Sequence, residues 1–221
     1  MLLKDKIVIV SGIGPGLGIK LAIEAAREGA AGVVAAARTE SKLEEAEARI
    51  RELGLKTPVL KVVTDITKDA DCSGLAKAAA EKFGRIDALL NIAGAVPQLD
   101  LFEMSDEQWD AGMALKLHGA RRLTIEAWPA LKKARGAVVL ISGNSASLPK
   151  APYAAVGTVN AAIVALAKAF ADRGILLSRY ENQYNLAVAD FDQALKLAPD
   201  NEKILILRGD AYAAQGKYSQ A

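Results

Sequence analysis

The chain has 221 residues, of which 52% are hydrophobic and 24% are charged, and its formal net charge is +2. This length suits one α/β domain, or one domain with a small appendage, and the near-neutral charge gives no reason to expect nucleic acid or an anionic membrane as a partner. No apolar run approaches the roughly 20 residues of a membrane span, and the chain leads from Met1 directly into a strand without a signal-peptide pattern.

The cysteine and histidine content limits the chemistry further. Cys72 is the only cysteine and His118 the only histidine, which excludes an internal disulfide and a metal site built from several histidines. We expect no metal, and we interpret Cys72 as an incidental thiol. A single thiol fits a reducing compartment, so we expect a soluble, cytoplasmic protein.

Apolar runs alternate with helical patterns along most of the chain. We expect strands at residues 7–10, 31–37, 59–63, 86–91 and 137–142. We expect helices at residues 19–27, 42–53, 69–83, 105–133 with a break near 128–129, and 153–173. Ser105 and Gln108 predict a capping box at the start of the long helical region. Strands that alternate with helices of this length predict βαβ units and a parallel sheet.

A glycine-rich turn joins the first strand to the first helix. Its sequence, Ser-Gly-Ile-Gly-Pro-Gly-Leu-Gly from Ser11, has the spacing Gly12-x-x-x-Gly16-x-Gly18 and not G-x-G-x-x-G. Glycines there let the backbone approach a pyrophosphate, and the helix N-terminus offers free N–H groups. Glycine also marks ordinary strand-to-helix turns, so the turn alone leaves both interpretations open.

Polar residues and glycines follow the other strands. Arg38, Asp65, residues 91–94 and residues 142–145 each stand just after a predicted strand. Because ligands of parallel sheets bind outside the carboxyl ends of the strands, these segments and the glycine turn predict one site.

These motifs, in this order, resemble the short-chain dehydrogenase/reductase family over about residues 1–174. The resemblance rests on the glycine turn, Asp65, Asn91-Ile-Ala-Gly, and Ile141-Ser followed by Tyr153. It implies a Rossmann-type, doubly wound parallel sheet that binds NAD(H) or NADP(H) and transfers a hydride to or from a small carbonyl or alcohol compound. The implied cofactor-binding residues are Gly12, Gly16, Leu17, Gly18, Arg38, Asp65, Ile66, Asn91, Ala93 and Gly94.

The choice between the two cofactors depends on the residue about 20 positions after the glycines. An acid there would bind the ribose 2′-hydroxyl of NAD(H), whereas an arginine favours the 2′-phosphate of NADP(H). Arg38 stands at this position, so we expect NADP(H), with NAD(H) as the alternative. The competing interpretation is a solvated arginine beside Glu40.

The catalytic part of the resemblance is incomplete. The family implies a tyrosine, a lysine four residues later, a serine and an asparagine. Tyr153 matches the tyrosine, and Ser142 and Ser145 flank the position of the serine, but Gly157 replaces the lysine and Lys116 the asparagine. Without a nearby cation only about one tyrosine in a thousand is ionised at pH 7. The sequence therefore leaves three hypotheses open: an impaired oxidoreductase, a catalytically silent dinucleotide-binding module with a helical segment for protein interaction, and a chimera without biological activity.

Two further possibilities attach to these residues. Lys116 or Lys150 could supply the missing cation, although spacing alone cannot place either side chain. Tyr153 could instead be an aromatic residue that caps the last helix and packs on the sheet.

The segment after residue 174 resembles a tetratricopeptide repeat. Its period is about 34 residues, and the matching residues are Ala187, Phe191, Pro199, Leu205, Gly209 and Tyr212. Only about one and a half repeats are present, whereas roughly three are needed for stability. We therefore predict a helical, hairpin-like segment at 175–221, fused to a Rossmann-type domain at 1–174 in a chimeric chain. Its helices would bind a protein partner, another copy or the first domain.

The family would continue with a sixth strand, a Pro-Gly turn and a seventh strand, which this chain does not contain. We therefore expect a truncated sheet with the order 3-2-1-4-5, in which the fifth strand forms an exposed edge.

Overall fold

The structure, a computed structural model, describes residues 1–197 and 200–214. The chain divides into two compact units, Met1–Leu166 and Ala167–Ala221. The border between the units lies inside one continuous helix, so the domain boundary drawn at residue 174 from the sequence stays a prediction.

The first unit contains a five-stranded parallel sheet with the order β3-β2-β1-β4-β5. This order confirms the sequence-based prediction. The strands are β1 (Ile7–Ser11), β2 (Gly32–Ala37), β3 (Val59–Val63), β4 (Ala88–Asn91) and β5 (Ala137–Leu140).

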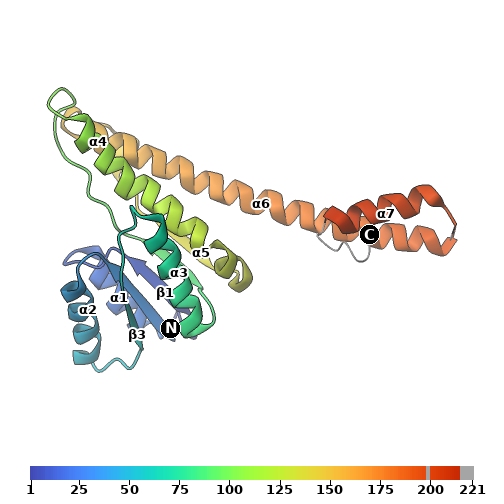
Figure 1. The fold of residues 1–221 in the computed structure, drawn as a ribbon, viewed down its shortest axis with the longest axis horizontal. Coiled ribbons are helices and arrows are strands. Elements are labelled where there is room, and N and C mark those ends of the chain that lie inside the picture. Colours follow the sequence, from blue (N-terminus) through green and yellow to red (C-terminus); the bar gives the residue numbers. More distant parts are fainter. Residues whose placement is uncertain (198–199, 215–221) are drawn as a thin grey trace. The chain divides into compact units, whose positions relative to one another are not determined.

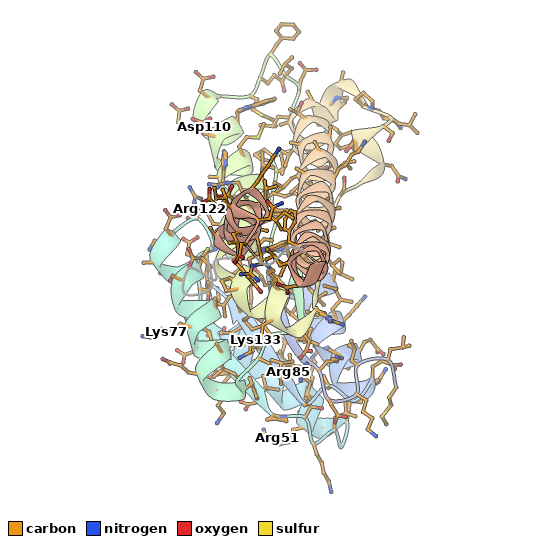
Figure 2. All side chains as sticks on the ribbon, turned by 90° about the vertical axis from the view of Figure 1, so that its right-hand side faces the viewer. Arg51, Lys77, Arg85, Asp110, Arg122 and Lys133 are labelled. Atoms are coloured by element: carbon orange, nitrogen blue, oxygen red, sulfur yellow. The ribbon has the colours of Figure 1, made fainter. Side chains whose placement is uncertain are left out.

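Helices cover both faces of the sheet (Figure 1). One core lies between the sheet and the helices α1 (Leu17–Arg27) and α2 (Glu40–Glu52), around Val8 and Val10. The other core lies between the sheet and the helices α3 (Asp69–Phe83) and α5 (Ala120–Ala134), around Ile9 and Leu89. Charged side chains such as Arg51 and Lys77 point away from the unit (Figure 2). In chain order, the helices that connect the five strands are α1 (Leu17–Arg27), α2 (Glu40–Glu52), α3 (Asp69–Phe83), α4 (Asp106–Gly112), the π-helix η1 (Met113–Gly119) and α5 (Ala120–Ala134).

The long helical region after β4 differs from its prediction in one place. The capping box of Ser105 and Gln108 is present at the start of α4. Pro129 does not break α5, which runs through it to Ala134. Because Pro129 has no N–H group, the carbonyl oxygen of Ile125, four residues earlier, has no helical hydrogen-bond donor. Both residues are exposed, so water can donate to this oxygen instead. The irregular turn lies earlier, in η1.

The last helix of the sheet unit begins after two short 3₁₀ turns, η2 (Asn144–Ala146) and η3 (Ala151–Tyr153), and forms α6 (Ala154–Leu197). Among the described residues, one segment, Ala151–Ala171, is long enough and, with a mean hydropathy of 1.6, apolar enough to cross a membrane. The expectation that no run has this length is therefore wrong. Length and composition alone do not separate such a segment from a core helix of a soluble domain, and Ala155, Val159 and Ile163 are buried at helical spacing.

The second unit contains the end of α6 and α7 (Glu202–Ala214). Arg208 on α7 donates to Asp192 on α6 at 2.9 Å, and Val188 and Ala211 are buried. Pro199, one of the residues that matched the repeat, lies outside the described residues. The helices are present as expected, while their assignment to a tetratricopeptide repeat stays a prediction.

Candidate functional site

The glycine turn begins where the central strand ends. Ser11, the last residue of β1, pairs with Ala36 of β2 on one side and with Asn91 of β4 on the other. The N–H of Gly12 donates to the Ala36 carbonyl oxygen at 2.8 Å, and the N–H of Ala93 donates to the Ser11 carbonyl oxygen at 2.9 Å. The turn is therefore held against both neighbouring strands. The first turn of α1 (Leu17–Arg27), whose N–H groups have no acceptor within the helix, follows it at the same sheet edge.

The four glycines of the turn are of two kinds. Gly12 has a φ of +99°, and an added Cβ would overlap the Ala93 backbone. A Cβ at Gly18 would overlap the Gly12 carbonyl group. These two glycines are required because strand, turn and helix pack closely. Gly14 and Gly16 have open space where a Cβ would stand, so a ligand can approach their backbone.

A cavity of about 450 Å³ lies at the carboxyl ends of the strands. Its size is typical of a small-molecule site. Among the described residues that line it, the charged ones are Arg38, Lys42 and Lys116, and there is no Asp or Glu. A lining with this charge favours an anionic ligand. The predicted cofactor-binding residues in the lining are Gly12, Gly16, Leu17, Gly18, Arg38, Ile66, Asn91, Ala93 and Gly94.

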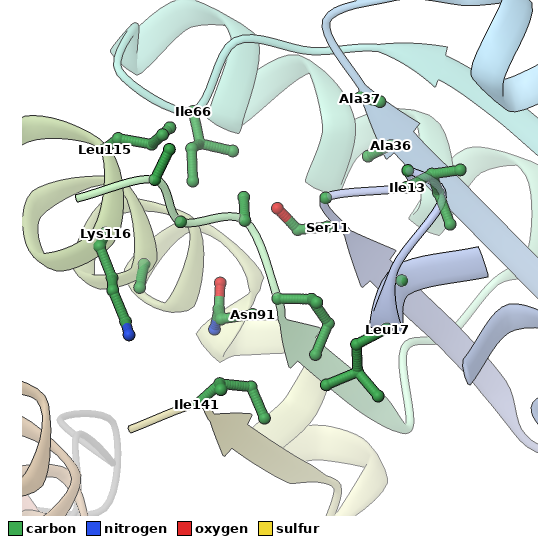
Figure 3. Close-up of a pocket in the computed structure, with 18 of the residues that line it drawn as sticks. Ser11, Ile13, Leu17, Ala36, Ala37, Ile66, Asn91, Leu115, Lys116 and Ile141 are labelled. Carbon is green, nitrogen blue, oxygen red and sulfur yellow. The ribbon is translucent and has the colours of Figure 1, made fainter. Parts of the chain in front are cut away.

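Two buried polar atoms of the lining, Ser11 Oγ and Asn91 Oδ1, have no hydrogen-bond partner among the residues that the structure describes. Ser11 is 1% exposed and Asn91 is 4% exposed. Asn91 is anchored by its Nδ2, which donates to Thr124 Oγ1 at 3.2 Å. Each unpartnered buried group costs about 1–3 kcal/mol. A ligand that supplies partners would remove this cost, and with the open glycines and the cations these residues fit a dinucleotide. Figure 3 shows Ser11, Asn91 and Lys116 around the cavity.

Asp65 is the predicted cofactor-binding residue that does not line the cavity. Its Oδ1 accepts hydrogen bonds from the Thr67 hydroxyl at 2.7 Å and the Thr67 N–H at 3.0 Å. The hydroxyl bond is the main reason that the pKa of Asp65 is lowered. The carboxylate therefore shapes the loop after β3, which presents its neighbours Thr64 and Ile66 to the cavity.

A lysine and an asparagine from two helices meet at the β4–β5 side of the cavity. Lys116 of η1 donates from Nζ to Oδ1 of Asn160 on α6 at 2.6 Å. Asn160 Nδ2 donates to Ser145 Oγ at 2.8 Å, and Ser142 Oγ donates to the Asn160 carbonyl oxygen at 3.0 Å. Burial lowers the pKa of Lys116. The structure thus brings both predicted serines together around Asn160, although neither serine lines the cavity.

Tyr153 and Gly157 lie elsewhere. Tyr153 ends η3, is 37% exposed and does not line the cavity. A Cβ at Gly157 would lie 3.1 Å from the Ser145 carbonyl oxygen and 3.6 Å from Pro149 Cβ. Position 157 therefore packs against the segment after β5, and the catalytic assignment of Tyr153 stays a prediction.

Sequence reasoning missed two residues of this region. Lys42 lines the cavity, and its place in the first turn of the helix that follows Arg38 could have indicated this. Asn160 lies three residues after Gly157, and hence on nearly the same side of the helix. This spacing, one turn beyond the expected lysine position, is the sequence signal that points to Asn160.

Comparisons with known proteins agree with this architecture. The family model described as short chain dehydrogenase matches residues 6–175. The chain is 35% identical over 145 residues to 11-beta-hydroxysteroid dehydrogenase A of Sesamum indicum, a match that covers 65% of this chain and 41% of that protein. It is 33% identical over 169 residues to an uncharacterized oxidoreductase of Thermotoga maritima, and this match covers 76% of this chain and 65% of that protein.

Solved structures give the same result. A short chain dehydrogenase from Mycobacterium smegmatis matches with a TM-score of 0.74 and 30% identity, over 79% of this chain and 73% of that chain. A 7α-hydroxysteroid dehydrogenase in complex with NADH matches with a TM-score of 0.69 and 26% identity, over 74% of this chain and 63% of that chain. The chain spans less than two thirds of the length of the two curated relatives. Its sheet, its glycine turn and the match over residues 6–175 show that it belongs to the short-chain dehydrogenase family.

Proposed function

We propose that the first unit binds NADP(H) in the cavity at the strand ends, and that its activity as an oxidoreductase on a small carbonyl or alcohol compound is impaired. The cavity carries this proposal. It combines open glycines, two buried polar atoms that no described residue hydrogen-bonds, and a lining whose described charges are all positive. When bound, the nicotinamide would give or accept a hydride.

Arg38 and Lys42 support NADP(H) over NAD(H). Both line the cavity just after β2, where the adenosine ribose lies in folds of this type. A 2′-phosphate there would accept charge-assisted hydrogen bonds. The 2′-hydroxyl of NAD(H) would need an acidic partner, and the described residues of the lining include none.

The surroundings of α6 support impaired catalysis. Tyr153 is not part of the lining, and no tyrosine is among the described residues that form it. The helix position that meets the two serines is occupied by Asn160. One turn earlier on the same face stands Val156, which has no hydroxyl to exchange a proton with a substrate. Binding without efficient turnover is the outcome that these positions favour.

Calorimetric titration with NADPH and NADH, together with an assay of NADPH oxidation by a panel of aldehydes and ketones, tests both parts. We expect NADPH to bind and turnover to be slow or absent. Arg38→Ala should weaken NADPH binding by roughly 10- to 100-fold and leave NADH binding nearly unchanged, because only NADPH carries the 2′-phosphate. Absence of binding for both cofactors would overturn the proposal. Rapid turnover that Tyr153→Phe abolishes would overturn the impairment.

A further inference from the structure

The contact between Lys116 and Asn160 is a fixed one. Asn160 is 3% exposed, and both ends of its amide are engaged. A lysine ammonium only donates hydrogen bonds, so the amide oxygen must face Lys116, at 2.6 Å, and the amide nitrogen must face Ser145 Oγ, at 2.8 Å. The orientation of Asn160 is thereby determined, and its oxygen holds the ammonium in one place.

This ammonium has no counter-charge within the described part of the chain. Lys6 and Lys61 pair with Asp87 and Glu47 at 3.3 Å and 2.8 Å, whereas Lys116 has only the neutral amide as a partner. One of its three N–H donors is used by Asn160, and two remain for other acceptors. A partly buried cation with a neutral partner is poorly stabilised. Oxygen acceptors on a ligand would improve its environment.

Lys116 also lies on the other side of the glycine turn from Arg38. Its side chain packs against Gly94, just after β4, at 3.1 Å from the ideal Cβ position, whereas Arg38 follows β2. The sheet order places β2 and β4 on opposite sides of β1. A dinucleotide whose pyrophosphate lies at the turn therefore extends its adenosine half toward Arg38 and its second ribose toward Lys116. Leu115, Ile141 and Ile163 give this end of the cavity an apolar lining.

From this arrangement we propose that Lys116 is a dinucleotide-binding residue whose ammonium binds the hydroxyl groups of the ribose in the nicotinamide half, and that Asn160 is the positioning residue that holds it there. The inference rests on the proposed function. In this arrangement the positive charge near the ribose comes from Lys116 on η1, across the cavity from α6. The ribose therefore has a charged partner even though position 157 is a glycine and not a lysine.

Calorimetry with two ligands separates this contact from the rest of the site. NADPH carries both halves of the dinucleotide, whereas adenosine 2′,5′-bisphosphate lacks the second ribose. Lys116→Met keeps most of the unbranched aliphatic side chain and removes the charge. It should weaken NADPH binding by about tenfold or more without changing the affinity for the bisphosphate. Lys42→Met is the matched control at the other end and should weaken both ligands.

An exchange variant tests the pairing. Lys116→Asn alone should lose NADPH affinity, and Asn160→Lys alone places two cations together. The double variant restores one ammonium and one amide, so its NADPH affinity should return to within about threefold of the wild-type value. Thermal unfolding monitored by circular dichroism identifies variants that fail to fold. If Asn160→Lys does not fold, Asn160→Ser in the presence of Lys116 tests the positioning role instead, because it keeps the ammonium and removes the amide oxygen that holds it at 2.6 Å. This variant should weaken NADPH binding and leave the affinity for the bisphosphate unchanged.

The outcomes are distinguishable. If the unmodified protein binds neither ligand, the proposed function fails. If it binds both, and Lys116→Met leaves NADPH binding unchanged or weakens both ligands equally, the role of Lys116 is refuted while the proposed function stands. A double variant that binds no better than Lys116→Asn would refute the positioning role of Asn160.

Discussion

Gly12→Ala should destabilise the first unit strongly, even without a ligand. The φ of +99° at Gly12 costs an L-residue roughly 1–2 kcal/mol. The added Cβ also overlaps the Ala93 backbone, which cannot move freely because its N–H donates to the Ser11 carbonyl oxygen at 2.9 Å. Relieving such overpacking typically costs about 1–3 kcal/mol. We therefore expect a loss of about 2–5 kcal/mol in the free energy of unfolding.

Urea unfolding followed by tryptophan fluorescence measures this loss in the relevant unit, because Trp109 and Trp128 both lie within Met1–Leu166. Gly14→Ala is the matched control. It belongs to the same turn, has no positive φ and has open space at the Cβ position, so its stability should stay within about 0.5 kcal/mol of the unmodified protein. Equal stabilities for the two variants would refute the close approach of the turn to β4.

Three further predictions concern single side chains. Ser11→Ala removes a buried hydroxyl that has no partner, so the ligand-free protein should gain about 1 kcal/mol in urea unfolding while NADPH affinity falls; a loss of stability would contradict the assignment. Asp87 is 5% exposed, and although burial raises its pKa, hydrogen bonds from Arg85, the Ile7 N–H and Lys6 lower it overall. The ionised carboxylate therefore stabilises the fold above the unfolded-state pKa, and this stabilisation is lost as the pH falls through the lower folded-state pKa. Asp87→Asn should lower the free energy of unfolding by about 2 kcal/mol at pH 7, and by progressively less below about pH 4, as measured by acid unfolding. A difference in stability between the two proteins that does not change with pH would contradict this role of Asp87. Burial raises the pKa of Cys72 to about 11, so its thiol should resist an aromatic disulfide reagent at pH 8 until denaturant is added, and rapid labelling of the folded chain would contradict its burial.

Most of the sheet unit could be predicted from the sequence because its signals are local. The central strands β1 and β2 are buried on both faces and read as continuous apolar runs, such as Ile7 to Val10. Ser105 and Gln108 carry their own capping chemistry. The strand ends, and so most of the cavity lining, followed from the rule that ligands bind at the carboxyl edge.

The remaining features depend on contacts that spacing cannot show. Pro129 remains within α5 because its surroundings are exposed. Asp65 matches a motif, but its carboxylate is engaged by Thr67. Asn160 is defined by its partners, Lys116 on another helix and Ser145 in the preceding loop, and neither partner is at a fixed sequence distance.

The cavity at the strand ends is the proposed binding site of NADP(H). Hydrogen–deuterium exchange measured by mass spectrometry, with and without saturating NADPH, tests both the binding and its location. We expect slower exchange in peptides that cover residues 11–18, 91–95 and 113–119, with little change in α7. Unchanged exchange in all three segments at saturating NADPH would contradict it.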